Sequence, residues 1–315
     1  MSNYKVFVDG HAGTTGLQIH ERLAGRSDLE LLRISEEQRK DLEARRALLN
    51  EADVVFLCLP DSAAQESASL VVSEKTRIID ASTAHRTDRD WVYGLPELSK
   101  EQRREIRTAK RLANPGCHAT GFILPIYPLV QQGAVPRDYP ITVHSVTGYS
   151  GGGKKLIEQY ETADLQRVEG PRHYALGLKH KHLPEMQQQA GLVFPPHFAP
   201  IVGNFYRGMT VAIPLLPRLM SKKLTAKDIH EILAAHYQGE HFVRVMPFDS
   251  EANLEDGYFN PEMCNNTNRA EIFVFGHQEQ VMLLTRLDNL GKGASGAAIQ
   301  NMNIMLGIAE ETGLE

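Results

Sequence analysis

The sequence predicts an α/β protein in which a parallel-sheet domain precedes an α+β domain with a mostly antiparallel sheet. Before about residue 114, short apolar runs alternate with helical patterns, and the run at 53–60 is continuous enough for a strand buried on both faces. After Cys117, strand patterns follow one another through tight turns and helices are fewer. With 315 residues, the chain is long enough for two domains.

The elements of the first part alternate regularly. We expect strands at 4–10, 29–35, 53–60 and 76–82, and helices at 14–24, 36–49 and 62–72. This order is typical of a parallel sheet with helices on both sides.

The second part has a different order of strands and helices. We expect strands at 140–150, 208–216 and 241–248, a hairpin at 270–290, and helices at 119–130, 225–239 and 292–311. Pro125 and Pro128 should kink or end the first of these helices within about two turns. We place the domain boundary near Asn114. Residues 1–114, completed by 290–315, then form one domain, and 115–289 form the other.

Composition excludes several classes of protein. The net charge of −5 does not favour binding to nucleic acid or to an anionic membrane. Lys5 and Asp9 interrupt the stretch that a signal peptide would need, and no apolar window reaches 18 residues. The three cysteines are too widely spaced for a disulfide framework, and we expect a cytoplasmic protein.

Glycines at 10, 13 and 16 connect the first strand to the first helix. Without side chains, the backbone can approach a pyrophosphate that faces the positive end of the helix. Glycines also serve tight strand-to-helix turns that bind nothing. The position in the first β-α unit favours a Rossmann-type dinucleotide site.

The end of the second strand bears on which dinucleotide binds. Basic and hydroxyl side chains gather there, and they favour a 2′-phosphate and hence NADP(H): Arg33, Ser35, Arg39 and Lys40. Glu36 and Glu37 leave a second interpretation open, because an acidic side chain at this point can hold the ribose hydroxyls of NAD.

Cys117 follows an Asn-Pro-Gly turn at the start of the helix expected at 119–130. An intracellular cysteine is often a small buried hydrophobe. At a helix N-terminus, however, unpaired N–H groups and the helix dipole stabilise a thiolate, and they can also hold an oxyanion. This placement indicates a nucleophile.

A proton partner for Cys117 is offered by His180 and His182, which are followed by Glu185. Two histidines two residues apart share one face of a strand, so a metal site has to be considered. No third ligand with suitable spacing is evident, and we expect no metal. One histidine can serve as acid/base while the carboxylate orients it or the substrate. Spacing does not decide which histidine carries the proton.

The motifs together resemble one family. They are the Gly10 loop, YGLPEL at 93–98, NPGCHAT at 114–120, SGGGKK at 150–155, HKHLPEM at 180–186 and DNLGKGASGAAIQNMN at 288–303. The chain is similar to the short bacterial N-acetyl-gamma-glutamyl-phosphate reductases of the semialdehyde dehydrogenase superfamily, and these motifs cover nearly its whole length. It departs at Lys181 and Leu183, where Arg and Thr are common.

The resemblance implies NADPH-dependent reduction of N-acetyl-gamma-glutamyl phosphate, in arginine biosynthesis, to a semialdehyde and inorganic phosphate through a cysteine thioester. Cys117 would be the nucleophile and His180 the acid/base. The implied substrate contacts are Arg86, Ser150, Lys154 and Glu185. The expected cofactor contacts are Gly10, Gly13, Thr14, Thr15, Gly16, Ser35, Arg39, Pro60, Asn289 and Gly293. The second domain would be catalytic and dimerising, and a homo-oligomer, dimer or tetramer, is expected.

Two other functions stay open. An enzyme like aspartate-semialdehyde dehydrogenase would use the same chemistry on a shorter, unacetylated substrate, and the H-x-H-x-P-E motif argues against it. A non-catalytic dinucleotide sensor would need no reactive thiol.

Overall fold

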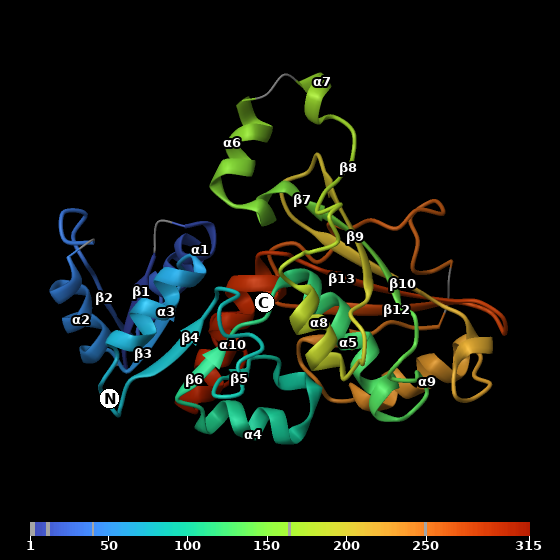
Figure 1. Ribbon diagram of the computed structural model, residues 1–315, viewed down its shortest axis with the longest axis horizontal. Helices are drawn as coiled ribbons and strands as arrows, with labels where there is room; N and C mark the ends of the chain where they lie inside the picture. Colours follow the sequence, from blue (N-terminus) through green and yellow to red (C-terminus); the bar gives the residue numbers. More distant parts are fainter. Residues whose placement is uncertain (1–3, 11–12, 40, 163–164, 249–250) are drawn as a thin grey trace. The chain divides into compact units, whose positions relative to one another are not determined.

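The computed structural model of the protein describes residues 4–10, 13–39, 41–162, 165–248 and 251–315. The chain forms two compact units (Figure 1). The first comprises the residues up to Pro115 together with Ala294–Leu314, and the second comprises Gly116–Gly293 together with Glu315.

The first unit contains a six-stranded parallel sheet in the order β2-β1-β3-β4-β6-β5. Its strands are β1 (Tyr4–Asp9), β2 (Leu29–Leu32), β3 (Val54–Leu57), β4 (Arg77–Asp80), β5 (Val92–Tyr93) and β6 (Arg111–Ala113). Its helices are α1 (Thr14–Ala24), α2 (Leu42–Glu51), α3 (Asp61–Leu70), α4 (Lys100–Thr108) and α10 (Gly296–Leu306). Alternate residues of β3 enter two separate cores. Val54 and Phe56 pack with side chains of α1 and α10, and Val55 and Leu57 pack with side chains of α2 and α3. Helices therefore cover both faces of the sheet, as the sequence predicts.

The prediction of a helix at 36–49 was wrong at its start. Asp41 caps α2, because its carboxylate accepts hydrogen bonds from the backbone N–H groups of Glu43 and Ala44. An aspartate at this position satisfies two of the unpaired N–H groups of the first turn, so the helix begins after it. Residues 33–39 consequently form the connection that follows β2.

The second unit contains a mixed, mostly antiparallel sheet of seven strands in the order β11-β12-β13-β10-β7-β9-β8. The strands are β7 (Thr142–Gly148), β8 (Arg172–His173), β9 (His197–Gly203), β10 (Met209–Leu215), β11 (Val243–Val245), β12 (Ala270–Gly276) and β13 (Val281–Leu287). The helices are α5 (Cys117–Gln131), α6 (Lys154–Thr162), α7 (Leu165–Val168), α8 (Leu183–Ala190) and α9 (Ala226–His236). The predicted hairpin is present as the β12–β13 pair, and the predicted α+β class is confirmed.

Helix α5 is buried along most of its length and continues through Pro125 and Pro128, so the prolines do not end it. A proline cannot donate to the carbonyl four residues earlier. For Pro128 that carbonyl belongs to Leu124, and the Tyr237 hydroxyl donates to it instead at 2.6 Å. An external donor thus replaces one of the hydrogen bonds that the prolines remove.

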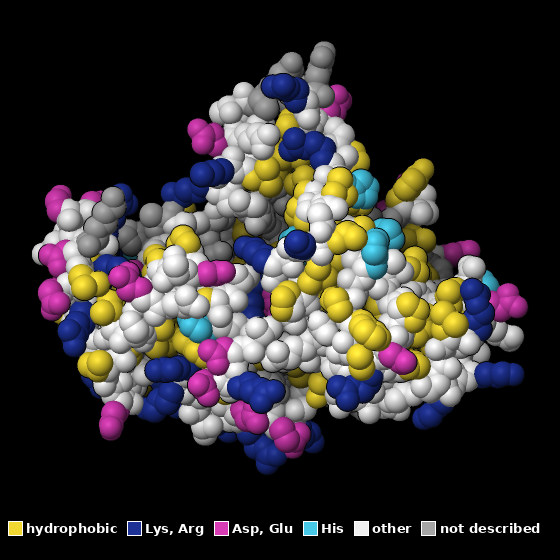
Figure 2. All heavy atoms as spheres, viewed as in Figure 1, with side chains coloured by type: hydrophobic (Ala, Val, Ile, Leu, Met, Phe, Trp, Pro, Cys, Tyr) yellow, Lys and Arg dark blue, Asp and Glu magenta, His cyan; other side chains and the backbone are white. Residues whose placement is uncertain are grey.

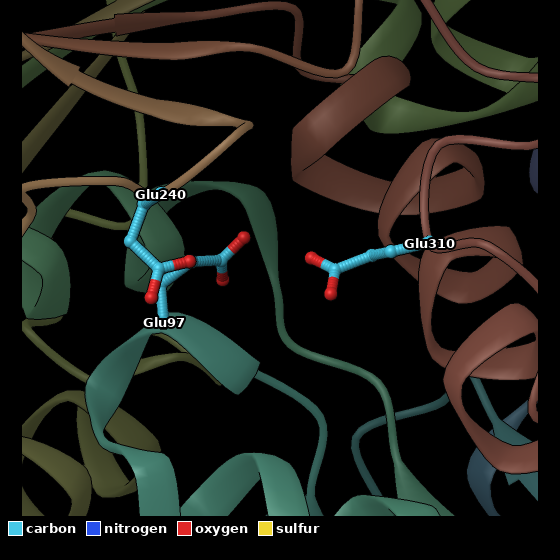
Figure 3. A group of neighbouring side chains, drawn as sticks. All are labelled: Glu97, Glu240 and Glu310. Carbon is cyan, nitrogen blue, oxygen red and sulfur yellow. The ribbon is translucent and has the colours of Figure 1, made fainter.

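The C-terminal residues are tied to the first unit by polar contacts. The amide of Gln300 donates to the carboxylates of Glu97 and Glu310, each at 2.7 Å. Figure 3 shows the Glu310 carboxylate directed toward Glu97, and the Glu240 drawn with them belongs to the second unit. Asn114 donates to the Ala294 carbonyl at 3.0 Å.

On the face seen in Figure 2, Lys and Arg side chains of the first unit are interspersed with Asp and Glu side chains. Within the described part of the chain, no helix is both long enough and apolar enough to cross a membrane.

Candidate active site

Cys117 is the first residue of α5 and is partly buried. Gly116 precedes it in extended conformation, and no side chain caps the helix. The N–H groups of a helix's first turn and the positive end of its dipole can stabilise a negative charge at the thiol or on a molecule bound beside it. This position suits the nucleophile role predicted for Cys117.

Gly293 packs directly against Cys117. A Cβ atom on Gly293 would lie 2.6 Å from Cβ of Cys117, too close for two carbon atoms. The glycine of the KGASG motif is thus required by its packing against Cys117.

Glu185 lies in the first turn of α8 and is buried. Its Oε2 accepts a hydrogen bond from the Gly116 N–H at 3.2 Å, and its Oε1 lies 3.9 Å from Nε2 of His182. This carboxylate holds the turn that presents Cys117.

The prediction that His180 and His182 lie on one face of a strand was wrong. They belong to the turn before α8, and His182 occupies the N-cap position. The N–H of His182 donates to Nδ1 of His180 at 3.1 Å, and the two rings are perpendicular, with centroids 4.7 Å apart. His182 is buried and His180 is partly exposed, so His180 is the more accessible of the two.

His118, next to Cys117, was not singled out by the sequence motifs as a functional residue. Its ring is buried between Ser145 and Tyr174: Nδ1 lies 2.8 Å from the Ser145 Oγ, and Nε2 lies 2.8 Å from the Tyr174 hydroxyl. The His180 ring lies 5.5 Å from the His118 ring and 5.9 Å from the Tyr174 ring. Tyr174 and His180 therefore lie close together.

The chain between these two side chains contains two unusual backbone conformations. Ala175 and Leu178 have positive φ angles of 52° and 53°, and the Leu178 N–H closes a turn on the Ala175 carbonyl at 2.9 Å. Such conformations cost free energy for residues other than glycine and cluster at functional sites. Here they form the turn that separates Tyr174 from His180.

Ser150, Asn289 and Lys154 belong to the same unit. The Asn289 amide donates to Ser150 Oγ at 3.0 Å, and its oxygen accepts from the Gly208 N–H at 2.8 Å. Both polar ends of Asn289 are therefore used within this unit. The buried Ser150 hydroxyl accepts this bond, and its own proton has no acceptor among the residues that the structure describes. Lys154 is exposed at the start of α6.

The glycine loop lies in the first unit, and residues 11 and 12 fall outside the described residues. Gly10 has φ +91°, and a Cβ atom there would lie 2.4 Å from the Cys58 carbonyl oxygen. Helix α1 begins with Thr14 and contains Thr15 and Gly16, and Gly13 caps it without a side-chain hydrogen bond. The first turn carries no acidic residue, and the buried Thr14 hydroxyl lacks a hydrogen-bond partner among the described residues. These features fit a pyrophosphate.

Ser35 and Arg39, which follow β2, are exposed. Arg39 forms an ion pair with Glu36 at 3.0 Å, and the Ser35 Oγ accepts from the Gln38 N–H at 3.3 Å. Lys40 lies outside the described residues. An exposed ion pair of this kind is weak, so a phosphate can compete with Glu36 for Arg39.

The other residues predicted in the first unit lie at carboxyl ends of its strands. Pro60 caps α3 directly after β3. Arg86 follows β4 and is buried, and its Nη2 donates to the Ala81 carbonyl at 3.1 Å. This is the edge of a parallel sheet at which ligands of such folds bind.

Comparison with known proteins agrees with this geometry. Residues 5–106 match the semialdehyde dehydrogenase NAD binding domain, and residues 117–289 match the semialdehyde dehydrogenase dimerisation domain. The chain is 49% identical to N-acetyl-gamma-glutamyl-phosphate reductase 2 of Nostoc sp., over all of both chains. It is 46% identical to the corresponding enzyme of Pseudomonas putida, over 98% of each. The chain belongs to the N-acetyl-gamma-glutamyl-phosphate reductase family.

Members of this family are NADP-dependent oxidoreductases, and this reductase has the fold of the wider superfamily. Aspartate semialdehyde dehydrogenase II of Vibrio cholerae aligns over 97% of this chain and 99% of its own, with a TM-score of 0.71 at 15% identity. The Francisella tularensis enzyme aligns over 96% of this chain and 100% of its own, with a TM-score of 0.72 at 17% identity. At these identities the likeness extends to the fold alone.

The reductase motifs do not identify every residue around the thiol. Ser145 and Tyr174 lie 28 and 57 positions beyond Cys117 in sequence number and carry no motif of their own. The signal for His118 was its place directly after the nucleophile, in the first turn of a buried helix.

Proposed function

We propose that this reductase converts N-acetyl-gamma-glutamyl phosphate to N-acetylglutamate 5-semialdehyde and inorganic phosphate with NADPH. The observation that carries the proposal is Cys117 at the uncapped N-terminus of α5, within a unit that also holds His180 and Glu185. Identity of 49% over the full length to a reductase of this name supports the choice of substrate.

The reaction divides into two steps at one thiol. Cys117 attacks the acyl carbon, the bond from that carbon to the phosphate oxygen breaks, and a thioester remains on the sulfur. His180 takes the thiol proton and returns a proton to the departing phosphate. The nicotinamide cofactor supplies a hydride to the thioester carbon when it is bound. The C–S bond then breaks, which releases the aldehyde and restores the thiolate at the helix N-terminus.

The contacts to the ligands are assigned in the same proposal. Gly10, Gly13, Thr14, Thr15 and Gly16 would hold the pyrophosphate, and Ser35 and Arg39 would hold the 2′-phosphate that distinguishes NADPH. Pro60 and Gly293 would border the cofactor. Asn289 would support the cofactor site indirectly, by holding Ser150 and Gly208 in place. Arg86, Ser150 and Lys154 would receive the anionic groups of the substrate. Glu185 would position the turn at Gly116.

A homodimer is also proposed, with the sheet of the second unit as its interface. One face of this sheet packs against α5 and α9. The side chains that point to the opposite face of the sheet are mainly apolar and only partly buried: Val146, Ala199, Ile201, Ala212, Pro214, Met282 and Leu284. A second copy would cover them, in agreement with the dimerisation domain that residues 117–289 match. Light scattering of the purified protein should give twice the chain mass.

The decisive experiment measures NADPH oxidation with N-acetylglutamyl phosphate and, in parallel, with aspartyl phosphate. The proposal expects turnover with the acetylated substrate, preference for NADPH over NADH, and loss of turnover in Cys117→Ser with cofactor binding retained. Faster reduction of aspartyl phosphate would favour the alternative enzyme. A Cys117→Ser variant within tenfold of the parent would remove the nucleophile assignment.

A further inference from the structure

His118 connects two hydroxyl groups, and the direction of its hydrogen bonds decides what Tyr174 can do. Burial, followed by the nearby His180 and Lys181, lowers the pKa of the His118 imidazole to about 3. The ring is therefore neutral near pH 7, with one N–H donor and one lone pair. It accepts one of its two 2.8 Å contacts and donates the other.

The Ser145 side of the contact decides the direction. The Ser145 Oγ is fully buried, and His118 Nδ1 is its only hydrogen-bond partner among the described residues. If Nδ1 carried the ring proton, the Ser145 hydroxyl proton would have no acceptor among the described residues, and a buried unpaired donor is destabilising. The favoured arrangement therefore has Ser145 donating to Nδ1, and Nε2–H donating to the Tyr174 oxygen.

In this arrangement the Tyr174 hydroxyl accepts from His118 and does not donate its own proton to the ring. Tyr174 is partly exposed, and His118 is its hydroxyl's only hydrogen-bond partner among the described residues. Burial, and then the charge of the nearby Cys117, raises the pKa of the Tyr174 phenol, so the phenol keeps its proton. A donor polarised by His118 is thus held within electrostatic range of the nucleophile.

We propose that His118 is a positioning residue that directs the Tyr174 hydroxyl toward the oxygen of the reacting acyl carbon. This inference rests on the proposed thioester chemistry. When sulfur or hydride adds to that carbon, the C=O π electrons move to the oxygen, which becomes negatively charged. Tyr174 donates a hydrogen bond to this oxyanion, and the C=O bond re-forms as phosphate or thiolate leaves. Tyr174 gives up no proton, so the step needs no further reactant.

The first test removes the hydroxyl alone. Tyr174→Phe should lower kcat about 10²–10³-fold, the usual effect of losing one oxyanion donor, with little change in KM. Alkylation of Cys117 by iodoacetamide, which forms no oxyanion, should keep its rate. Tyr160→Phe is the matched control, because Tyr160 is a buried tyrosine of the same unit whose hydroxyl accepts from Arg172. A Tyr174→Phe kcat within threefold of the parent would overturn the proposal.

The second test separates the two ends of the His118 ring. His118→Gln places an amide N–H near the position of Nε2 and can still donate to Tyr174. His118→Asn places a carbonyl oxygen near Nδ1, which satisfies Ser145 but leaves Tyr174 without its donor. We expect His118→Gln to keep kcat within about tenfold and His118→Asn to approach Tyr174→Phe. A purely structural role for His118 predicts the reverse order, because Ser145 is the more deeply buried partner.

Failure of the inference is distinguishable from failure of the proposed function. If Cys117→Ser stays active, the thioester chemistry itself is wrong. If Cys117→Ser is inactive while Tyr174→Phe equals the parent, only the role of Tyr174 is wrong. If both His118 variants unfold, Tyr174→Phe still tests the role of the Tyr174 hydroxyl. This variant should fold, because Tyr174 is the partly exposed partner of His118 and Ser145 is the buried one.

Discussion

The backbone N–H of Gly116 donates to the Glu185 carboxylate at 3.2 Å, although the two residues are 69 positions apart. The contact joins the turn before Cys117 to the first turn of α8. Burial of a carboxylate is costly unless it is hydrogen-bonded, and this contact and His182, 3.9 Å away, offset part of that cost. We therefore expect Glu185 to position the turn that precedes Cys117.

The first prediction compares Glu185→Gln with Glu185→Ala. Glutamine keeps an oxygen that can accept from Gly116, and kcat should stay within about tenfold of the parent. Alanine leaves the Gly116 N–H unpaired, which should cost about 1–3 kcal/mol of unfolding free energy. Displacement of the thiol should lower kcat about 10²-fold. Equal damage from both variants would show that the negative charge matters, and not the hydrogen bond to Gly116.

Gly293 provides the second prediction. Gly293→Ala should fold but lower kcat about 10²-fold and slow the alkylation of Cys117, since the new Cβ would lie 2.6 Å from Cβ of Cys117 and has to displace that residue. Gly25→Ala is the control, because nothing lies within 4 Å of a Cβ atom there. Unchanged alkylation in Gly293→Ala, measured with iodoacetamide, would show that the surrounding turn can shift without moving the thiol.

The fold was largely predictable because its signals are local. Buried parallel strands are continuous apolar runs, and the strand-to-helix alternation is visible in the sequence. One error lies where a long-range partner decides, because the Tyr237 hydroxyl satisfies a carbonyl that Pro128 leaves without a donor. The other is local, because Asp41 caps α2 and delays its start. Strands of two or three residues, such as β5, are too short to show a periodicity.

The site was predictable only at residues that belong to motifs. Cys117, His180 and Glu185 sit in short patterns, and the structure brings them into one unit. Tyr174 and Ser145 reach the same place from β8 and β7 through tertiary packing, which no local pattern encodes. Asn289 is predicted to lie near the cofactor, and the bonds of its amide to Ser150 and Gly208 could not be foreseen from its motif.

The third prediction concerns the two histidines of the turn before α8. If His180 carries the proton, His180→Asn should lower kcat about 10²–10⁴-fold, with a smaller effect on KM. His182→Asn should lower kcat less. His182 is buried and lies near Glu185, so its loss should act on local structure and not on proton transfer. The pH–rate profile should lose one ionisation in the first variant and keep it in the second. The reverse result would move the acid/base role to His182.

The last prediction uses the buried His118 as a source of pH-dependent stability. Its folded-state pKa of about 3 lies below the ordinary value of 6.5, so the unfolded chain binds the proton more readily. The stability that goes with a neutral ring is complete above pH 6.5 and is lost as the pH falls toward 3. At pH 5 this single group should destabilise the protein by about 2 kcal/mol relative to pH 7.

His118→Gln removes the titrating group and keeps a polar side chain in its place. The free energy of unfolding, measured with urea at pH 5 and at pH 7, should therefore fall less for this variant than for the parent, by about 2 kcal/mol. His277→Gln, at an exposed histidine after β12, should follow the parent. Parallel pH dependence of the parent and His118→Gln would mean that His118 takes up its proton equally well in the folded and unfolded chains. The ring would then not be held neutral, and the hydrogen-bond direction assigned to it from Ser145 toward Tyr174 would lose its basis.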